Sequence, residues 1–242
     1  MRRFNIQMKI VYRLSESANN KNRPHYFDKK ALFVDFIKKF ISCRPSNSIY
    51  VIADNVSDET FQFLTQYVNP EYITRTSLGN SQSFLFGAQL AADIFDDDDY
   101  VYFAEDDYIY TQSAAEIIED GMNVGDYISG YDHPDKYVHP TLGGNPYVKD
   151  GGEETRVILS NLSHWKITNS CCMTFAVSVK VLREDIDVYK RFCTQQSPND
   201  FAMFIELFRT KGRKIISCIP GVSTHAEIEF LTPFIDWSLQ LS

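Results

Sequence analysis

The chain has 242 residues, of which 44% are hydrophobic, enough for one large globular domain with its own core. Its net charge of −8 comes without a cluster of lysines and arginines, which argues against a protein that binds the phosphate backbone of nucleic acid. The five cysteines lack Cys-x-x-Cys spacing and predict reduced thiols, with neither a disulfide framework nor a zinc site. No apolar run approaches the ~20 residues that span a bilayer, and no signal peptide is recognisable, so we expect a cytoplasmic protein without a transmembrane segment.

Strands and helices alternate along the first part of the chain. Strands are expected at 7–14, 48–53 and within 72–80, and helices at 28–40, 58–68 and 81–95. The second strand ends on an acid, Asp54. Strand, helix and strand in succession predict parallel strands joined by helical crossovers. The four acids from Asp96 to Asp99 are interpreted as a solvated turn, because consecutive side chains cannot converge on one point.

The segment from Tyr100 to Tyr110, YVYFAEDDYIY, begins as a strand that is apolar on both faces and stops at Glu105, Asp106 and Asp107. Adjacent carboxylates repel one another by up to ~4 kcal/mol per close pair at an effective dielectric of about 20, so they take up protons or bind a cation. A divalent metal at the carboxyl end of a strand accounts for them, since ligands of open α/β sheets bind at that edge. A solvated acidic turn is the alternative.

The second part of the chain surrounds one long irregular segment. Helices are expected at 113–122, 179–193 and 201–212, a strand leading into a loop at 126–137, a β segment at 164–178 and a last strand at 214–220. Residues 138–163 contain four glycines and two prolines, which predicts a flexible lid, a binding loop or a disordered segment. His225 follows the last strand. Because the carboxyl ends of parallel strands share one edge, Asp54, Asp107 and His225 are expected to converge.

This order of features resembles the nucleotide-sugar glycosyltransferases of the GT-A fold, closest to the family-two-like inverting enzymes of bacteria and large viruses. The resemblance runs from Met8 to Trp237 and depends on the strand-end Asp54, on EDD, and on NDF at 199–201 and STH at 223–225. It implies a single Rossmann-like α/β domain over 1–242, with a mainly parallel central sheet flanked by helices. A nucleotide-binding half would span 1–110 and an acceptor-binding half 111–242.

The resemblance also implies roles for individual residues. Asp107 and His225 would ligate Mn²⁺ or Mg²⁺, and Asp200 would be the general base, although Asn199 departs from the usual Glu-Asp pair. The donor-binding residues would be Arg13, Asp54, Asn80, Ser83, Glu105 and Asp106. The acceptor-binding residues would be Asp132, His133, His164 and Trp165.

The implied reaction moves a sugar from a nucleoside diphosphate, UDP first and GDP or dTDP next, to a glycan or another hydroxyl acceptor with inversion. A divalent ion neutralises the leaving diphosphate. A carboxylate takes the proton of the acceptor hydroxyl, an effect worth ~10²–10⁴ in rate. One metal and one base are sufficient for in-line displacement.

Each assignment has a structural alternative. His225 could be a surface or core histidine whose hydrogen bonds are made within the protein, and Asp200 could be the N-cap of a helix. Asp54 could stabilise a turn, and Trp165 could be a core residue. Two other functions also remain open. A nucleotidyltransferase usually carries a glycine-rich loop after its first strand, and SESANNKNRP has Lys21 and Arg23 but no glycine. The other function is that of a non-catalytic nucleotide-sugar or glycan-binding module. This alternative stays open because Asn199 departs from the usual Glu-Asp pair.

Overall fold

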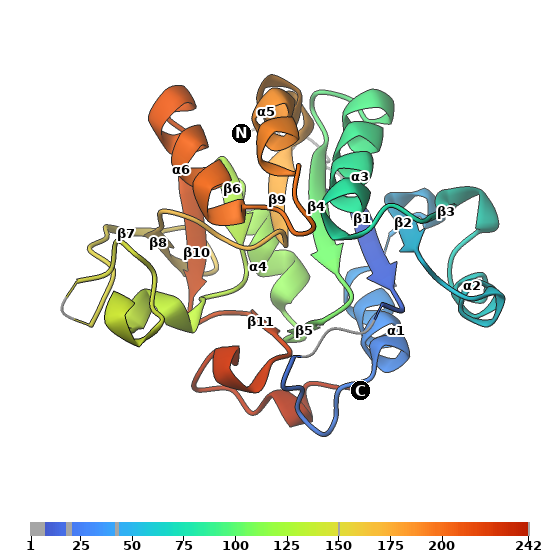
Figure 1. Cartoon of the computed structure of the whole chain (residues 1–242), viewed down its shortest axis with the longest axis horizontal. Coiled ribbons are helices and arrows are strands. Elements are labelled where there is room, and N and C mark those ends of the chain that lie inside the picture. The colour runs from blue at the N-terminus through green and yellow to red at the C-terminus, as the bar shows by residue number, and fades with distance from the viewer. Residues whose placement is uncertain (1–7, 18–20, 42–43, 150, 242) are drawn as a thin grey trace.

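A nine-stranded sheet forms the centre of the part of the chain that the computed structural model describes, residues 8–17, 21–41, 44–149 and 151–241 (Figure 1). Cys43 lies outside these residues. The strands, in their order across the sheet, are β3 (Ile73–Thr76), β2 (Ile49–Asp54), β1 (Met8–Ser15), β4 (Tyr100–Glu105), β9 (Phe175–Ser178), β6 (Tyr127–Ser129), β10 (Ile215–Ile219), β8 (His164–Ile167) and β7 (Val157–Leu159). All of them except β9 and β8 run in one direction, which agrees with the mainly parallel sheet expected from the sequence.

Helices cover both faces of this sheet (Figure 1). The face with α1 (Lys29–Phe40) also carries α2 (Asp58–Leu64) and α4 (Ala114–Gly121), and the other face carries α3 (Asn80–Ile94), α5 (Val179–Phe192) and α6 (Asp200–Lys211). The side chains of β1 contribute in alternation to the hydrophobic core on one face of the sheet and to that on the other, because successive side chains of a strand point to opposite faces. Tyr12 packs on Phe33 and Phe36 of α1, whereas Val11 belongs to the cluster that includes Phe84 of α3.

A second, two-stranded sheet lies beyond the carboxyl end of β4. It pairs β5 (Tyr108–Tyr110) with β11 (Ser223–His225) in antiparallel fashion, so that Tyr108 lies opposite His225. Figure 1 shows the arrowheads of β4 and β10 pointing toward this pair. Because only Asp106 and Asp107 separate β4 from β5, the small sheet places His225 beside the acidic turn. Neither three-residue strand was predicted from the sequence.

The second part of the chain differs from expectation mainly between 164 and 178. The strand within 126–137 ends at Ser129 and leads into a loop, as expected, but the β segment expected at 164–178 is two strands, β8 and β9, that are not neighbours in the sheet. Residues 168–174 between them are irregular because polar side chains bind locally: Thr168 donates to Glu153 and Asn169 donates to Asn145. Cys171 and Cys172, which one continuous strand would place on opposite faces, therefore lie in an irregular segment. The segment 138–163 contains the edge strand β7 and a 3-10 turn at Pro140–Leu142.

None of the helices within the described ranges is long and apolar enough to cross a membrane. Strands from before and after residue 110 belong to one continuous sheet. The division into a nucleotide-binding half and an acceptor-binding half at this residue stays a prediction.

Candidate functional site

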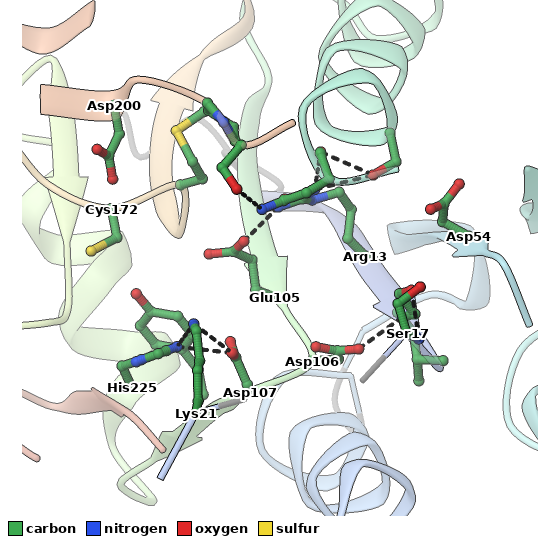
Figure 2. A pocket seen from close by; sticks show the side chains of 18 of the residues that line it. Arg13, Ser17, Lys21, Asp54, Glu105, Asp106, Asp107, Cys172, Asp200 and His225 are labelled. Carbon is green, nitrogen blue, oxygen red and sulfur yellow. Dashed lines mark hydrogen bonds and ion pairs between the residues drawn. The ribbon is translucent and has the colours of Figure 1, made fainter. Parts of the chain in front are cut away.

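A cavity of about 570 Å³ opens at the carboxyl edge of the sheet, between the ends of β1, β2 and β4, the starts of α3 and α6, and β11. Most of the site residues predicted from the sequence line it: Arg13, Asp54, Asn80, Ser83, Glu105, Asp106, Asp107, His133, Asp200 and His225. The sheet edge thus gathers side chains that lie far apart in the sequence, as parallel topology requires. Figure 2 shows Asp200 and Cys172 across the cavity from Asp106 and Asp107.

Each acid of the Glu105-Asp106-Asp107 run is paired with a cation from β1, from the start of α1 or from the segment between them. Arg13 contacts Glu105 at 2.5 Å and Lys29 contacts Asp106 at 2.9 Å. Arg23 contacts Asp107 at 2.8 Å, and Lys21 lies 3.5 Å from the same carboxylate. These pairs relieve the repulsion expected from three adjacent carboxylates.

The pKa values of the three acids differ in direction because their surroundings differ. Burial raises the pKa of Glu105, with Arg13 opposing the shift, and burial also raises the pKa of Asp106, with Lys29 opposing it. Burial acts in the same direction on Asp107, but the charges of His225, Lys21 and Arg23 outweigh it and hold the pKa of this carboxyl well below its usual range. Asp107 is therefore the acid held most firmly as an anion.

Asp107 and His225 meet in the cavity, as expected from the sequence, although 118 residues separate them. Their Oδ2 and Nε2 atoms are 2.8 Å apart. The pairing of β5 with β11 produces this contact, and the Ala226 N–H donates to the Asp107 carbonyl at 2.8 Å beside it. Behind the ring, Glu227 Oε2 lies 3.3 Å from His225 Nδ1.

This pair fits a divalent ion that takes its remaining ligands from a substrate. Neighbouring ligands at about 2.1 Å from an octahedral ion lie about 3.0 Å from each other, close to the spacing of Asp107 Oδ2 and His225 Nε2. Among the described residues, no three His, Cys, Asp or Glu side chains are grouped to hold a metal on their own. One or two protein ligands completed by phosphate oxygens and water are usual for Mg²⁺ sites. The role of Asp107 and His225 as metal ligands stays a prediction.

Arg13 joins β1, β4 and the start of α3. Its guanidinium donates to the Asn80 carbonyl at 2.6 Å, to the Asn80 side chain at 2.8 Å and to Ser83 Oγ at 3.1 Å, besides pairing with Glu105. Gly79, with φ of 78°, turns the chain into α3 in a conformation that favours glycine. Arg13 thereby fixes the helix start that borders the cavity.

Asp54 lines the cavity, but its carboxylate is engaged within the chain. Oδ1 accepts from Thr76 Oγ1 at 2.8 Å and from the Leu78 N–H at 2.6 Å. Oδ2 accepts from the Gly79 N–H at 3.0 Å and from Asn55 Nδ2 at 2.8 Å. An ionised carboxylate offers about four acceptor positions, and all four are used here. Asp54 therefore stabilises the turn after β3, and a contact with a nucleobase stays a prediction that would require one of these bonds to be exchanged.

Asp200 opens α6 without capping it. Asn199 is the N-cap, because its side chain accepts from the Ala202 N–H, while Asp200 Oδ1 accepts from the Phe201 N–H at 2.7 Å. The cap explains why an asparagine stands before Asp200 and leaves the acid directed into the cavity (Figure 2). Burial raises the pKa of Asp200, which suits a carboxylate that must take up a proton.

Two of the four residues predicted to bind the acceptor are buried outside the cavity. Trp165 is fully buried and donates to Ser160 Oγ at 2.8 Å, and a Cβ at Gly121 would lie only 2.7 Å from its ring. It is a core residue, so its predicted contact with the acceptor, as a flat aromatic surface under the sugar (a sugar platform), is wrong at this position. Asp132 is buried between Lys166, at 2.8 Å, and the Tyr137 hydroxyl, at 2.6 Å.

The other two acceptor residues differ from each other. His164 is exposed on β8 and does not line the cavity. His133 does line it, between the rings of Tyr131 and Phe230, whose centroids lie 4.9 Å and 5.1 Å from the imidazole. Only His133 is therefore placed to contact a ligand there.

Several cavity residues were not predicted as site residues from the sequence: Ser15, Lys21, Lys29, Cys172, Glu227 and Phe230. Lys29 is one of several lysines in the α1 pattern, and the spacing alone does not tell which of them turns back toward β4. Glu227 stands two residues after His225, a spacing that could have indicated a partner for the imidazole.

The fold and this mixed acidic and basic cavity define an α/β protein with a cavity at the carboxyl edge of its sheet, the edge at which open α/β sheets bind ligands. No family model matches the chain, and no curated protein matches it. A solved structure described as a nucleotide-diphospho-sugar transferase from Desulfovibrio desulfuricans G20 is similar over 88% of this chain and 79% of its own, with a TM-score of 0.51 and 12% identity.

Two further solved structures are similar at lower TM-scores. A 4-diphosphocytidyl-2C-methyl-D-erythritol synthase from Anaerococcus prevotii DSM 20548 covers 88% of each chain, with a TM-score of 0.45 and 10% identity. S. aureus TarS 1-349 has a TM-score of 0.46 and 16% identity, and this chain spans 58% of its length. At such identities the likeness concerns the fold alone. The fold is the Rossmann-like α/β arrangement of the nucleotide-diphospho-sugar transferase.

Proposed function

We propose that the protein is a glycosyltransferase that moves a sugar from a nucleoside-diphosphate donor to a hydroxyl acceptor with inversion. One observation carries the proposal: Asp107 and His225 meet at 2.8 Å in the same cavity that receives the half-buried carboxylate of Asp200. A pair that could hold a metal ion for the diphosphate and a proton acceptor on the other side of the cavity are the two parts that such a displacement needs. The glycan acceptor, UDP as the first donor nucleotide and a cytoplasmic location belong to the same proposal.

The residues of this chain divide the work between the two substrates. Lys21 and Lys29 lie on the acidic side of the cavity and would hold the donor diphosphate by charge. A Mn²⁺ or Mg²⁺ ion held by Asp107 and His225 would neutralise the charge that develops on the leaving diphosphate. Asp200 would take the proton of the acceptor hydroxyl, and His133 would contact the acceptor beside it. The raised pKa of Asp200 makes it a stronger base than an ordinary aspartate.

Nucleotidyl transfer is the second candidate, and a specific observation favours it. Lys21, Arg23 and Lys29 follow β1 and face the acidic turn, so this segment supplies positive charge for a triphosphate without a glycine-rich loop. The two candidates differ in their products. Glycosyl transfer or donor hydrolysis releases a nucleoside diphosphate, whereas nucleotidyl transfer from a nucleoside triphosphate to a sugar phosphate releases pyrophosphate.

The test measures both products from matched reactions. The purified chain is incubated with UDP-, GDP- and dTDP-sugars, or with nucleoside triphosphates and sugar phosphates, with and without Mn²⁺. Asp200→Asn is the test variant, and Asp187→Asn, an exposed acid of α5 paired with Lys190, is the control. Metal-stimulated release of nucleoside diphosphate that is lost only in Asp200→Asn supports glycosyl transfer. Pyrophosphate release supports the second candidate, and donor binding without either product indicates a binding module and refutes both.

A further inference from the structure

The ammonium of Lys21 lies where Asp107, His225 and Glu227 converge (Figure 2). Its Nζ is 2.9 Å from His225 Nε2, 3.5 Å from Asp107 Oδ2 and 3.7 Å from Glu227 Oε2. Glu227 is one of the cavity residues that the proposed function leaves without a role. These contacts give Lys21 the surroundings of a bound cation.

Each nitrogen of the His225 ring faces a charged group. Nδ1 lies 3.3 Å from the Glu227 carboxylate, and Nε2 lies 2.8 Å from the Asp107 carboxylate and 2.9 Å from the Lys21 ammonium. A metal ion is bound by the lone pair of a neutral imidazole, which Nε2 can offer when the ring hydrogen is on Nδ1, toward Glu227.

The Lys21 ammonium lies against the two atoms that would hold a divalent ion. Its Nζ contacts both Asp107 Oδ2 and His225 Nε2. The ammonium and the ion have charges of the same sign and would use the same two atoms, so they would compete for this pair.

We propose that Lys21 is a tethered competitor for the divalent-cation site: its ammonium occupies the Asp107–His225 pair until a divalent ion displaces it. Glu227 is a positioning residue, which holds the imidazole through Nδ1 so that Nε2 faces the cation site beside Asp107. The Lys21 side chain is 36% exposed and has a flexible stem, so it can leave the pair without repacking of the core. Where the proposed function also holds, the displaced ammonium turns to the donor diphosphate. The exchange of cations itself does not require a nucleotide.

The test titrates Mn²⁺ alone into the full chain and follows the electron paramagnetic resonance signal of the free ion. Lys21→Met is expected to bind Mn²⁺ about tenfold more tightly than the natural chain, the factor that corresponds to losing one charge-assisted contact. Lys21→Gln repeats the test with a polar side chain in case Lys21→Met does not fold. Glu227→Gln is expected to bind Mn²⁺ about 10- to 100-fold more weakly, as is typical when the partner of a ligating histidine is lost.

Lys30→Met is the matched control, because Lys30 is an exposed lysine of α1 that pairs with Glu59 away from the cavity. Its Mn²⁺ affinity is expected to equal that of the natural chain. Unchanged or weaker Mn²⁺ binding in both Lys21 variants would overturn the inference. It would also be overturned if neither the natural chain nor any variant bound Mn²⁺. Tighter Mn²⁺ binding in Lys21→Met, together with no product from any sugar donor in the natural chain, would support the inference and refute glycosyl transfer.

Discussion

Replacing Arg13 by methionine tests the ion pair that joins β1, β4 and α3. The Arg13 side chain is 9% exposed, and its loss leaves Glu105 in the cavity wall without its cation. Removing one partner of a buried pair costs ~3–5 kcal/mol, and the lower end, about 3 kcal/mol, applies here because 22% of the Glu105 side chain remains exposed. For a chain of this length, each kcal/mol lowers Tm by ~2–4 °C, so we expect a loss of roughly 6–12 °C.

Urea unfolding followed by far-UV circular dichroism measures the change in the free energy of unfolding. Arg75→Met is the control: Arg75 forms an exposed pair with Asp58, and such pairs contribute ~0–1 kcal/mol. The double variant Arg13→Met/Glu105→Gln should recover part of the loss, because it removes the unpaired charge as well as its partner. An Arg13→Met variant within 1 kcal/mol of the natural chain, or a double variant no more stable than the single one, would refute this reasoning.

Three further predictions concern the cavity and the core. Asp200→Asn should lower kcat by ~10²–10⁴ with donor affinity unchanged, and the natural activity should fall on the acid side at a higher pH than for an ordinary aspartate, because a base with a raised pKa takes up its proton earlier. A pH–rate profile in which the activity falls on the acid side at the pH expected for an ordinary aspartate contradicts the assignment. Asp107→Asn should abolish Mn²⁺-dependent donor binding in calorimetry, and unchanged metal dependence would show that the site is misplaced. Trp165→Ala should cost ~3–5 kcal/mol of stability without weakening acceptor binding, and weaker acceptor binding at full stability would restore the sugar platform.

The structure also changes what an alanine at Asp107 is expected to do. From the sequence, Asp107→Ala should leave the fold intact, because it removes one of three repelling acids. In the structure, however, the Asp107 carboxylate is the partner of Arg23, Lys21 and His225. Its removal therefore takes away the carboxylate that these three side chains share, and asparagine is the more conservative substitution.

Patterns within a single element were predictable from the sequence. Phe33, Phe36 and Phe40 repeat at helical spacing, and the structure places all three in the core cluster on the α1 face. The apolar run that stops at Glu105 becomes β4, buried along most of its length. Local periodicity records which side of an element is apolar, and burial of that side is what fixes the element in the fold.

Features that depend on distant partners were not predictable in the same way. The strands β5 and β11 have three residues each, too few for a period, and each exists because it pairs with the other. Trp165 is a core residue because Gly121 leaves room for its ring, and nothing near residue 165 in the sequence reveals that space. The cations around the acidic turn were hidden for the same reason, since their partners lie on another strand.

The pairing of β5 with β11 has a consequence for the order in which the protein is made. Asp107 leaves the ribosome 118 residues before His225. At ~5–20 residues per second, translation takes roughly 6–24 seconds to cover that interval. The central strands β1 to β4 can pair during this time, but the acidic turn stays without its imidazole until β11 has been synthesised. A nascent chain can therefore have paired its central strands and still lack the contact between Asp107 and His225.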